Sequence, residues 1–113
     1  MKRVRFVGSA KSDLSAFPKD ARSRAGHELF MVQVGREPDD WKPMSAVGSG
    51  AREIRMRDEA GAFRVIYVAK FEDAVYVLHA FQKKTPKTSC VDLELAKERY
   101  RIARELAQGA KHD

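Results

Sequence analysis

The hydrophobic and polar positions along the chain change their period several times, and four stretches are typical of β-strands. The first is RVRFVG, residues 3–8, in which valine and phenylalanine alternate with arginine. The other three are AREIRMRD, FRVIYVAKF and AVYVLHAFQKK, which follow one another between residues 51 and 84. Only EAGA and a short segment around Asp73 separate them, and connections this short join antiparallel neighbours. The pattern therefore predicts an N-terminal strand and a three-stranded antiparallel meander.

Apolar residues at helical spacing predict helices on both sides of this meander in the sequence. A brief helix begins at Ser12 and ends before Pro18, because proline disfavours the helical conformation of the residue before it. A second helix has Pro18 in its first turn and continues to Gly35, so that the two form a helical hairpin. In VDLELAKERYRIARELAQG, apolar residues recur on one face, which predicts an amphipathic C-terminal helix that ends at Gly109.

The stretch between the hairpin and the meander, REPDDWKPMSAVGSG, residues 36–50, has no sustained period. It contains prolines and glycines, so we predict a loop that Trp41 and Met44 hold against the body of the protein. A chain of 113 residues has the length of one ordinary domain. The sequence therefore predicts a single α+β domain over residues 1–113, composed of strand, helical hairpin, meander and terminal helix.

The composition is typical of a folded protein, and the cysteine content and apolar runs indicate its cellular location. Hydrophobic residues make up 43% of the chain and charged residues 34%, which is typical of a globular rather than a disordered protein. The lone Cys90 cannot form an internal disulfide, and the opening MKRVRFVGSA has too short an apolar run for a signal peptide. No run is long enough to span a bilayer. We therefore expect a cytoplasmic protein that is not inserted in a membrane.

The balance of charge favours an anionic partner. The chain has 22 Lys plus Arg against 16 Asp plus Glu, a net charge of +6, and a pI near 9.7. A surplus of this sign attracts nucleic acid or an acidic protein and makes the encounter dependent on salt. The alternative is that the surplus serves solubility alone.

The first meander strand is predicted to carry a charged face. Side chains alternate across a strand, so Ile54 and Met56 point one way and three charged residues point the other. These three are Glu53, Arg55 and Arg57. Arg52 instead shares the face of Ile54, which indicates that the strand begins beyond the core.

Arg64, near the start of the second meander strand, adds to this charged face. A hairpin through EAGA could bring Arg64 close to Arg55 or Arg57. Like charges opposed across strands repel by up to about 1 kcal/mol, and a bound anion would remove that cost. The alternative is that glutamates form ordinary surface pairs with these cations. The available glutamates are Glu53, Glu59 and Glu72.

The third meander strand continues into KKTPKT, a segment with many hydrogen-bond donors and no carboxylate. Its charged residues are Lys83, Lys84 and Lys87, with Thr85 and Thr88 between and after them. Phosphate oxygens would suit such a segment. Charged loops are, however, often only solvated, so this stretch alone is a weak signal.

His79 lies in the apolar part of the same strand and has two possible roles. It is either a core histidine that is hydrogen-bonded, or a general acid or base, a role for which histidine is the most common residue. The scattered histidines and the lone cysteine do not form a metal site, and no phosphate-binding loop, dinucleotide motif or serine nucleophile is present. We therefore expect no metal and no cofactor.

The segment from Trp41 to Tyr100 resembles the phage-derived, HigB-like branch of the RelE/ParE toxin superfamily. The resemblance covers more than half of the chain, and its most specific motifs are EIRMRD, GAFRVIYVAKF, LHAFQKKTPKT and DLELAKERY, in that order. The N-terminal part agrees in layout only. The resemblance implies a RelE-like fold, whose strand, helical hairpin and meander match the elements predicted above.

The resemblance implies the toxin of a type II toxin-antitoxin system. RelE and HigB toxins cleave translated mRNA at the ribosome and so inhibit translation, whereas ParE relatives on the same fold poison DNA gyrase. The implied partners are the ribosome, mRNA and a cognate antitoxin with a helix-turn-helix domain. The alternatives to a metal-independent endoribonuclease are a ParE-like gyrase inhibitor and a non-catalytic module that binds RNA or protein.

The resemblance also implies which residues form the site. Arg55 matches a basic residue on the first meander strand and Arg64 matches the arginine that opens the second. Lys84 matches the basic residue that closes the third. Lys83 and His79 belong to the LHAFQKK motif and are expected to assist. Some cleaving relatives have a tyrosine just after this strand, where this chain has TPKTSCV.

Cleavage would use the 2′-hydroxyl of the RNA as the nucleophile against the adjacent phosphate. Arginine and lysine would stabilise the phosphorane, and the acid and base could be His79, Glu53 or a lysine whose pKa is lowered by its cationic neighbours. The further residues expected to contact RNA are Arg52, Arg57 and Lys87. The hypothesis requires the cations of the three meander strands to converge on one concave spot that accepts a phosphate.

Overall fold

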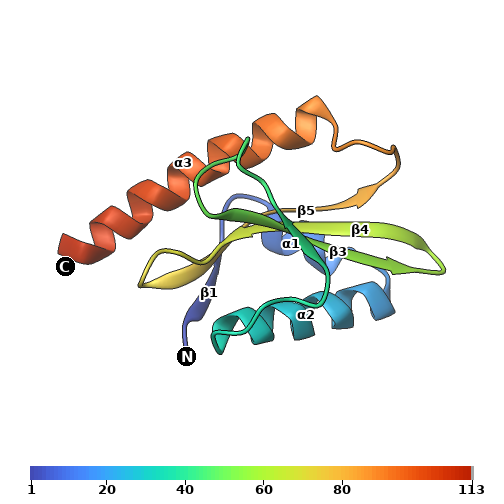
Figure 1. The fold of residues 1–113 in the computed structure, drawn as a ribbon, viewed down its shortest axis with the longest axis horizontal. Helices are drawn as coiled ribbons and strands as arrows, with labels where there is room; N and C mark the ends of the chain where they lie inside the picture. The colour runs from blue at the N-terminus through green and yellow to red at the C-terminus, as the bar shows by residue number, and fades with distance from the viewer. Residues whose placement is uncertain (113) are drawn as a thin grey trace.

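A five-stranded sheet with helices on both faces forms the centre of the computed structural model, which describes the backbone of residues 1–112 and the side chains of residues 1–110 (Figure 1). The elements are β1 (Arg3–Phe6), α1 (Ala10–Ser15), α2 (Lys19–Gln33), β2 (Trp41–Pro43), β3 (Ala51–Asp58), β4 (Gly61–Val68), β5 (Ala74–Lys83) and α3 (Cys90–His112). No described helix is long and apolar enough to cross a membrane.

The strands lie in the order β1-β5-β4-β3-β2, and the predicted meander is confirmed. β3, β4 and β5 pair antiparallel through short turns, while β1 pairs parallel with β5 because the helical hairpin intervenes between β1 and the rest of the sheet. The α+β class predicted from the periodicity is therefore correct.

The prediction of a loop over residues 36–50 is wrong at residues 41–43, which form the short edge strand β2. Trp41 pairs with Ile54 and Pro43 pairs with Arg52. A proline is tolerated there because an edge strand leaves one side of its backbone unpaired. A smaller correction concerns α2, in which Pro18 is the residue before the first helical turn and not part of it.

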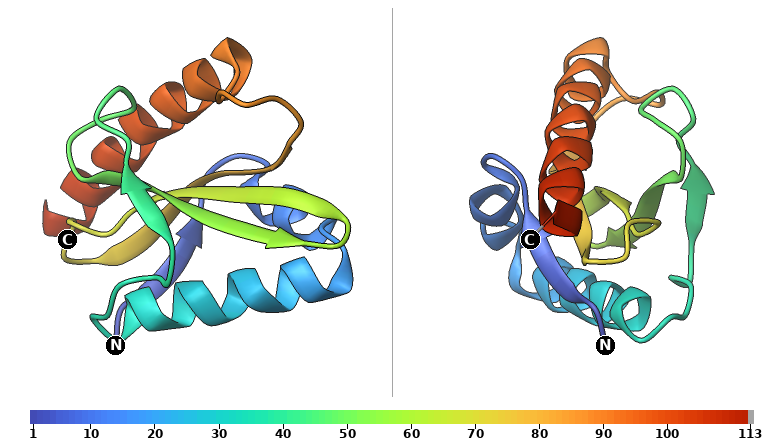
Figure 2. Two further views of the ribbon diagram at one scale, coloured as in Figure 1. Left: turned by 45° about the vertical axis from the view of Figure 1, so that its right-hand side comes forward. Right: turned by 90° about the vertical axis from the view of Figure 1, so that its left-hand side faces the viewer.

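The two faces of the sheet have separate cores. One core lies between the sheet and α1 and α2, and the other lies between the sheet and α3 (Figure 2). The first contains Ile54, Phe63 and Val77, and the second contains Ile66 and Leu78. Helices therefore cover both faces of the sheet over much of their area.

α3 also holds the segment between β2 and β3 in place. The Tyr100 hydroxyl donates a hydrogen bond to the carbonyl oxygen of Ser49 at 2.6 Å. The ring of Tyr100 lies against Gly48 so closely that a Cβ at Gly48 would come within 2.6 Å of three ring atoms. Any larger residue at position 48 must therefore displace Tyr100 or the turn.

We expect Gly48→Ala to lower the free energy of unfolding by about 1–3 kcal/mol, because it overpacks a buried aromatic contact. Gly26→Ala is the matched control: a Cβ there meets nothing within 4 Å, and alanine in the middle of α2 should raise stability by about 0.5–1 kcal/mol. Urea denaturation of both variants measures the two effects, and equal stability of the two would contradict the packing argument.

Candidate functional site

Arg55 and Arg64 are directly opposed across the β3–β4 pair, as the short turn between these strands predicts. They lie on the face of the sheet that α3 covers farther along, whereas Ile54 and Met56 lie in the core on the other face. Arg55 is exposed and Arg64 is 6% exposed. The loop between β5 and α3 curves over the same end of the sheet as the β3–β4 turn (Figure 1).

The carboxylate of Glu53 lies among these cations and is fully buried. Its Oε1 is 3.5 Å from Nε of Arg64 and 3.9 Å from Nζ of Lys42 on β2. Its Oε2 accepts a hydrogen bond of 3.2 Å from the hydroxyl of Thr88, in the loop before α3. A glutamate thus pairs with a strand cation, but as a buried pair and not as the ordinary surface pair of the alternative. The contacts of Glu53 join four segments of the chain.

Arg64 is held by the backbone as well as by Glu53. Its Nη1 donates to the carbonyl oxygen of Phe63 at 3.0 Å, with a longer contact of 3.5 Å to that of Met56. Burial lowers the pKa of Arg64, Glu53 opposes that shift, and Arg55 with Arg57 adds to it. Asp40 also opposes the shift, more weakly than Glu53, so two carboxylates act on Arg64 beside these two arginines.

Lys83, and not Lys84, is the lysine on this face. Lys83 pairs with Ala62, two residues from Arg64 on β4, so the two side chains lie on the same side of the sheet. Burial lowers the pKa of Lys83, as does the charge of Arg64 nearby. Lys84, which the resemblance matches to the closing basic residue, follows the end of β5 and is exposed.

A β-bulge in β5 decides which lysine faces the cluster, by which we mean Arg55, Arg64 and Lys83 with the carboxylate of Glu53. The β4–β5 register shifts between Ile66 and Tyr67, so that Leu78 and His79 both lie on the α3 face. Beyond the bulge the alternation continues in the opposite phase, and Phe81 and Lys83 take the α3 face.

His79 is buried and hydrogen-bonded, as one of its two alternatives predicts. Its Nε2 lies 2.7 Å from Oδ1 of Asp92 in the first turn of α3, and its ring stacks on Phe81 with centroids 4.7 Å apart. Asp92 also contacts Ser89, which precedes α3: its Oδ2 accepts from the Ser89 hydroxyl at 2.7 Å, and its N–H donates to the same hydroxyl at 3.1 Å. The role of His79 as acid or base stays a prediction.

The residues expected to contact RNA do not all lie together. Arg57 is exposed on β3 and Lys87 is exposed in the loop before α3. Arg52 lies on the other face of the sheet, where its guanidinium stacks over Trp41 at 4.0 Å and contacts Glu37 at 3.8 Å. The structure thus excludes Arg52 from the cluster, and a concave seat for phosphate stays a prediction.

Sequence reasoning missed Lys42 and Asp92 as members of the site. Lys42 went unnoticed because the strand that aligns it with Glu53 was predicted as loop. A signal for Asp92 exists, since serine three residues before an acidic residue marks the start of a helix. Within the described residues, no group of three or more histidine, cysteine, aspartate or glutamate side chains could hold a metal ion.

The comparison with protein families matches residues 12–101 to the family described as Phage derived protein Gp49-like (DUF891). This chain belongs to the Gp49-like family. The Gp49-like family is a member of the RelE/ParE-like toxins, and the five-stranded sheet with its flanking helices is compatible with a RelE-like fold. The matched region includes Arg55, Arg64 and Lys83. A search of curated proteins finds no match.

We expect Glu53→Gln to destabilise the Gp49-like fold by about 2 kcal/mol, because it leaves the buried Arg64 without its counter-charge. Glu59→Gln, at an exposed position in the turn after β3, is the control and should change stability by less than about 0.5 kcal/mol. Chemical denaturation measures both. Equal effects of the two substitutions would show that Glu53 does not balance the cluster.

The lowered pKa of Lys83 predicts how stability responds to alkaline pH. The unfolded chain binds the proton more tightly than the folded chain, so this group's contribution makes stability rise as pH increases from the lowered pKa towards the ordinary value of 10.5. Lys83→Met should remove this component, whereas Lys84→Met should retain it. Denaturation of both variants across that pH range is the measurement, and an identical pH profile for the two would contradict the placement of Lys83.

Proposed function

We propose that this Gp49-like protein is the toxin of a type II toxin-antitoxin system, of the HigB-like branch, and that it cleaves mRNA on the translating ribosome. The observation that carries the proposal is the opposed pair Arg55 and Arg64, with Lys83 on the same face and the carboxylate of Glu53 buried beside Arg64. A site with more positive than negative charge at close range favours the binding of an anion such as a backbone phosphate.

The proposed reaction needs no group beyond the RNA and the protein. The 2′-oxygen attacks the adjacent phosphorus, the bond from phosphorus to the 5′-oxygen of the next nucleotide breaks, and a 2′,3′-cyclic phosphate remains. One proton leaves the 2′-oxygen and one arrives at the departing 5′-oxygen. Arg55 and Lys83 would stabilise the charge that develops on the phosphorane, because their side chains are less enclosed than that of Arg64.

Arg64 has a different role in this proposal. Its guanidinium contacts the Phe63 carbonyl and Glu53. In this proposal it acts as a fixed positive charge near the phosphate. A preorganised cation of this kind contributes without reorganising during the reaction. Lys84 and Lys87, which are exposed, would contact RNA outside the reacting phosphate.

Of the two candidate proton acceptors, Glu53 and His79, Glu53 has the better position. It is the carboxylate next to Arg64, and a substrate that displaces the Thr88 hydroxyl would free one of its oxygens. His79 is held by Asp92 and stacks on Phe81, so it suits the support of Phe81 and of the start of α3. The ribosome would align the mRNA, and a cognate antitoxin, expected to carry a helix-turn-helix domain, would neutralise the toxin.

Induced expression followed by mapping of mRNA 5′ ends tests the proposal. The wild-type chain should arrest growth and produce new 5′ ends within translated frames, while Arg55→Ala combined with Lys83→Ala should reduce cleavage by about 100-fold or more. Arg22→Ala, exposed on α2, is the control and should remain toxic. Intact mRNA together with loss of DNA supercoiling would instead indicate a ParE-like gyrase inhibitor, and the absence of arrest would indicate a non-catalytic binding module.

A further inference from the structure

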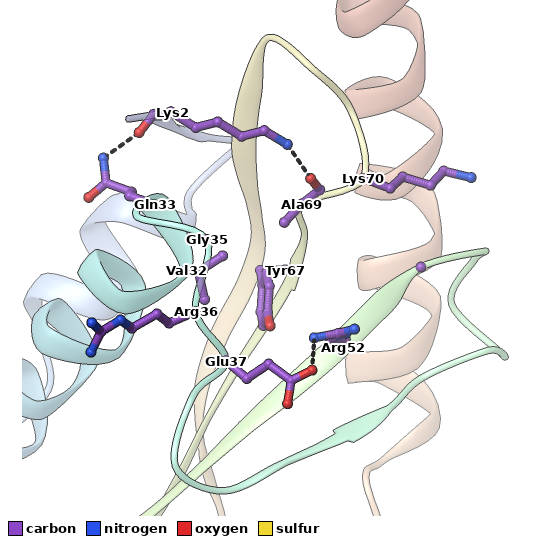
Figure 3. Close-up of a pocket in the computed structure, with 11 residues that line it drawn as sticks. Lys2, Val32, Gln33, Gly35, Arg36, Glu37, Arg52, Tyr67, Ala69 and Lys70 are labelled. Atoms are coloured by element: carbon purple, nitrogen blue, oxygen red, sulfur yellow. Dashed lines mark hydrogen bonds and ion pairs between the residues drawn. The ribbon is translucent and has the colours of Figure 1, made fainter.

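A hollow of about 410 Å³ lies on the face of the sheet away from the cluster described above (Figure 3). It is bordered by the end of α2, the start of β3 and the end of β4. Arg64 and Glu53 face the side of α3, whereas Tyr67 at the centre of this hollow belongs to the core on the side of α2. The hollow is therefore separate from the proposed RNA site.

The inner surface of the hollow is largely apolar. Val32 and Ala69 lie on either side of it, with Tyr67 between them (Figure 3). Gly35 and Gly50 supply bare backbone to the walls, both with positive φ values of 86° and 80°. A larger residue at either position would be strained in that conformation, and a Cβ at Gly50 would come within 3.0 Å of the Lys70 side chain.

The charges around the hollow fall into two groups. Nζ of Lys2 donates to the carbonyl oxygens of Ala69 and Phe71 at 2.5 and 2.7 Å, and Arg52 pairs with Glu37, so both cations are engaged.

Arg36 and Lys70 form the second group. Both are exposed, and neither forms an ion pair with a residue that the structure describes. Figure 3 shows them on opposite sides of the hollow, with side chains that extend away from Tyr67. Nζ of Lys70 lies 5.5 Å from the centroid of the Phe71 ring and has no carboxylate partner among the described residues. An apolar centre with such a cation on each side favours an apolar side chain that is flanked by carboxylates.

Other occupants fit less well. A nucleobase needs an exposed ring face for stacking, but Tyr67 is 1% exposed and the guanidinium of Arg52 covers the ring of Trp41. A second copy of this chain has a net charge of +6 and would bring further positive charge close to Arg36 and Lys70, which is unfavourable. The charges thus favour an acidic protein partner.

We propose that this hollow docks an acidic peptide segment, which inserts one aliphatic or aromatic side chain between Val32 and Ala69 and places carboxylates beside Arg36 and Lys70. The identity of the protein that carries this segment, the antitoxin, rests on the function proposed above. The segment would bind on the α2 face and leave Arg55 and Lys83 uncovered at its point of contact.

The probe for the test is the full-length polypeptide encoded by the reading frame directly adjacent to this one, titrated into the intact chain by calorimetry. Arg36→Glu combined with Lys70→Glu should weaken its affinity by about tenfold or more, with a loss of salt dependence. Ala69→Phe, which fills the hollow without a change of charge, should weaken it by a similar factor. Lys11→Glu combined with Arg104→Glu, at exposed positions outside the hollow, is the charge-matched control and should bind within about twofold of the wild type.

The outcomes separate the docking site from the proposed function. Loss of affinity in both hollow variants with the control unchanged supports the proposal, provided that circular dichroism shows the same fold in all of them. Unchanged affinity in either hollow variant, or equal loss in the control, overturns the docking site and leaves the toxin assignment intact. Failure of the wild-type chain to bind the polypeptide overturns the docking site together with the antitoxin assignment, while the mapping of mRNA ends still decides separately whether the chain is a toxin.

Discussion

The buried carboxylate of Glu53 is the constraint on which the rest of this site depends. It is fully buried and lies within ion-pair distance of Lys42 and Arg64, while Thr88 donates a hydrogen bond to it. A buried charge without partners would be costly, so β2, β4 and the loop before α3 must each take up positions that supply them. The same carboxylate permits Arg64 to lie opposite Arg55, because it offsets part of their repulsion. Fold and candidate chemistry thus share one interaction.

The two faces of the sheet provide two kinds of surface. On the side of α3, the cations lie on the part of the sheet beyond the start of this helix, and the buried carboxylate of Glu53 lies among them. On the side of α2, cations stand around an apolar hollow whose walls contain glycine. The first arrangement suits a phosphodiester, and the second suits a protein segment. In the proposed function, action on RNA and recognition by a neutralising protein would therefore lie on separate faces.

Much of this layout follows from the sequence, and the parts that do not have identifiable reasons. The opposition of Arg55 and Arg64 follows from alternation and a short turn. The choice between Lys83 and Lys84 does not, because unbroken alternation from Leu78 would place Lys84 on the α3 face, and the bulge at Leu78 and His79 reverses the phase. β2 is too short to show a period, so the contribution of Lys42 was also hidden. The α2 face hollow depends on packing between distant segments, which no local pattern encodes.

The most direct test of the central claim is a structure of this chain on a translating ribosome, with 2′-O-methyl mRNA in place of the reactive strand. The account predicts that a backbone phosphate contacts Arg55 and Lys83 on the α3 face, with the blocked 2′-oxygen near Glu53. A complex in which the mRNA lies against the α2 face, or in which these side chains contact no phosphate, would contradict it.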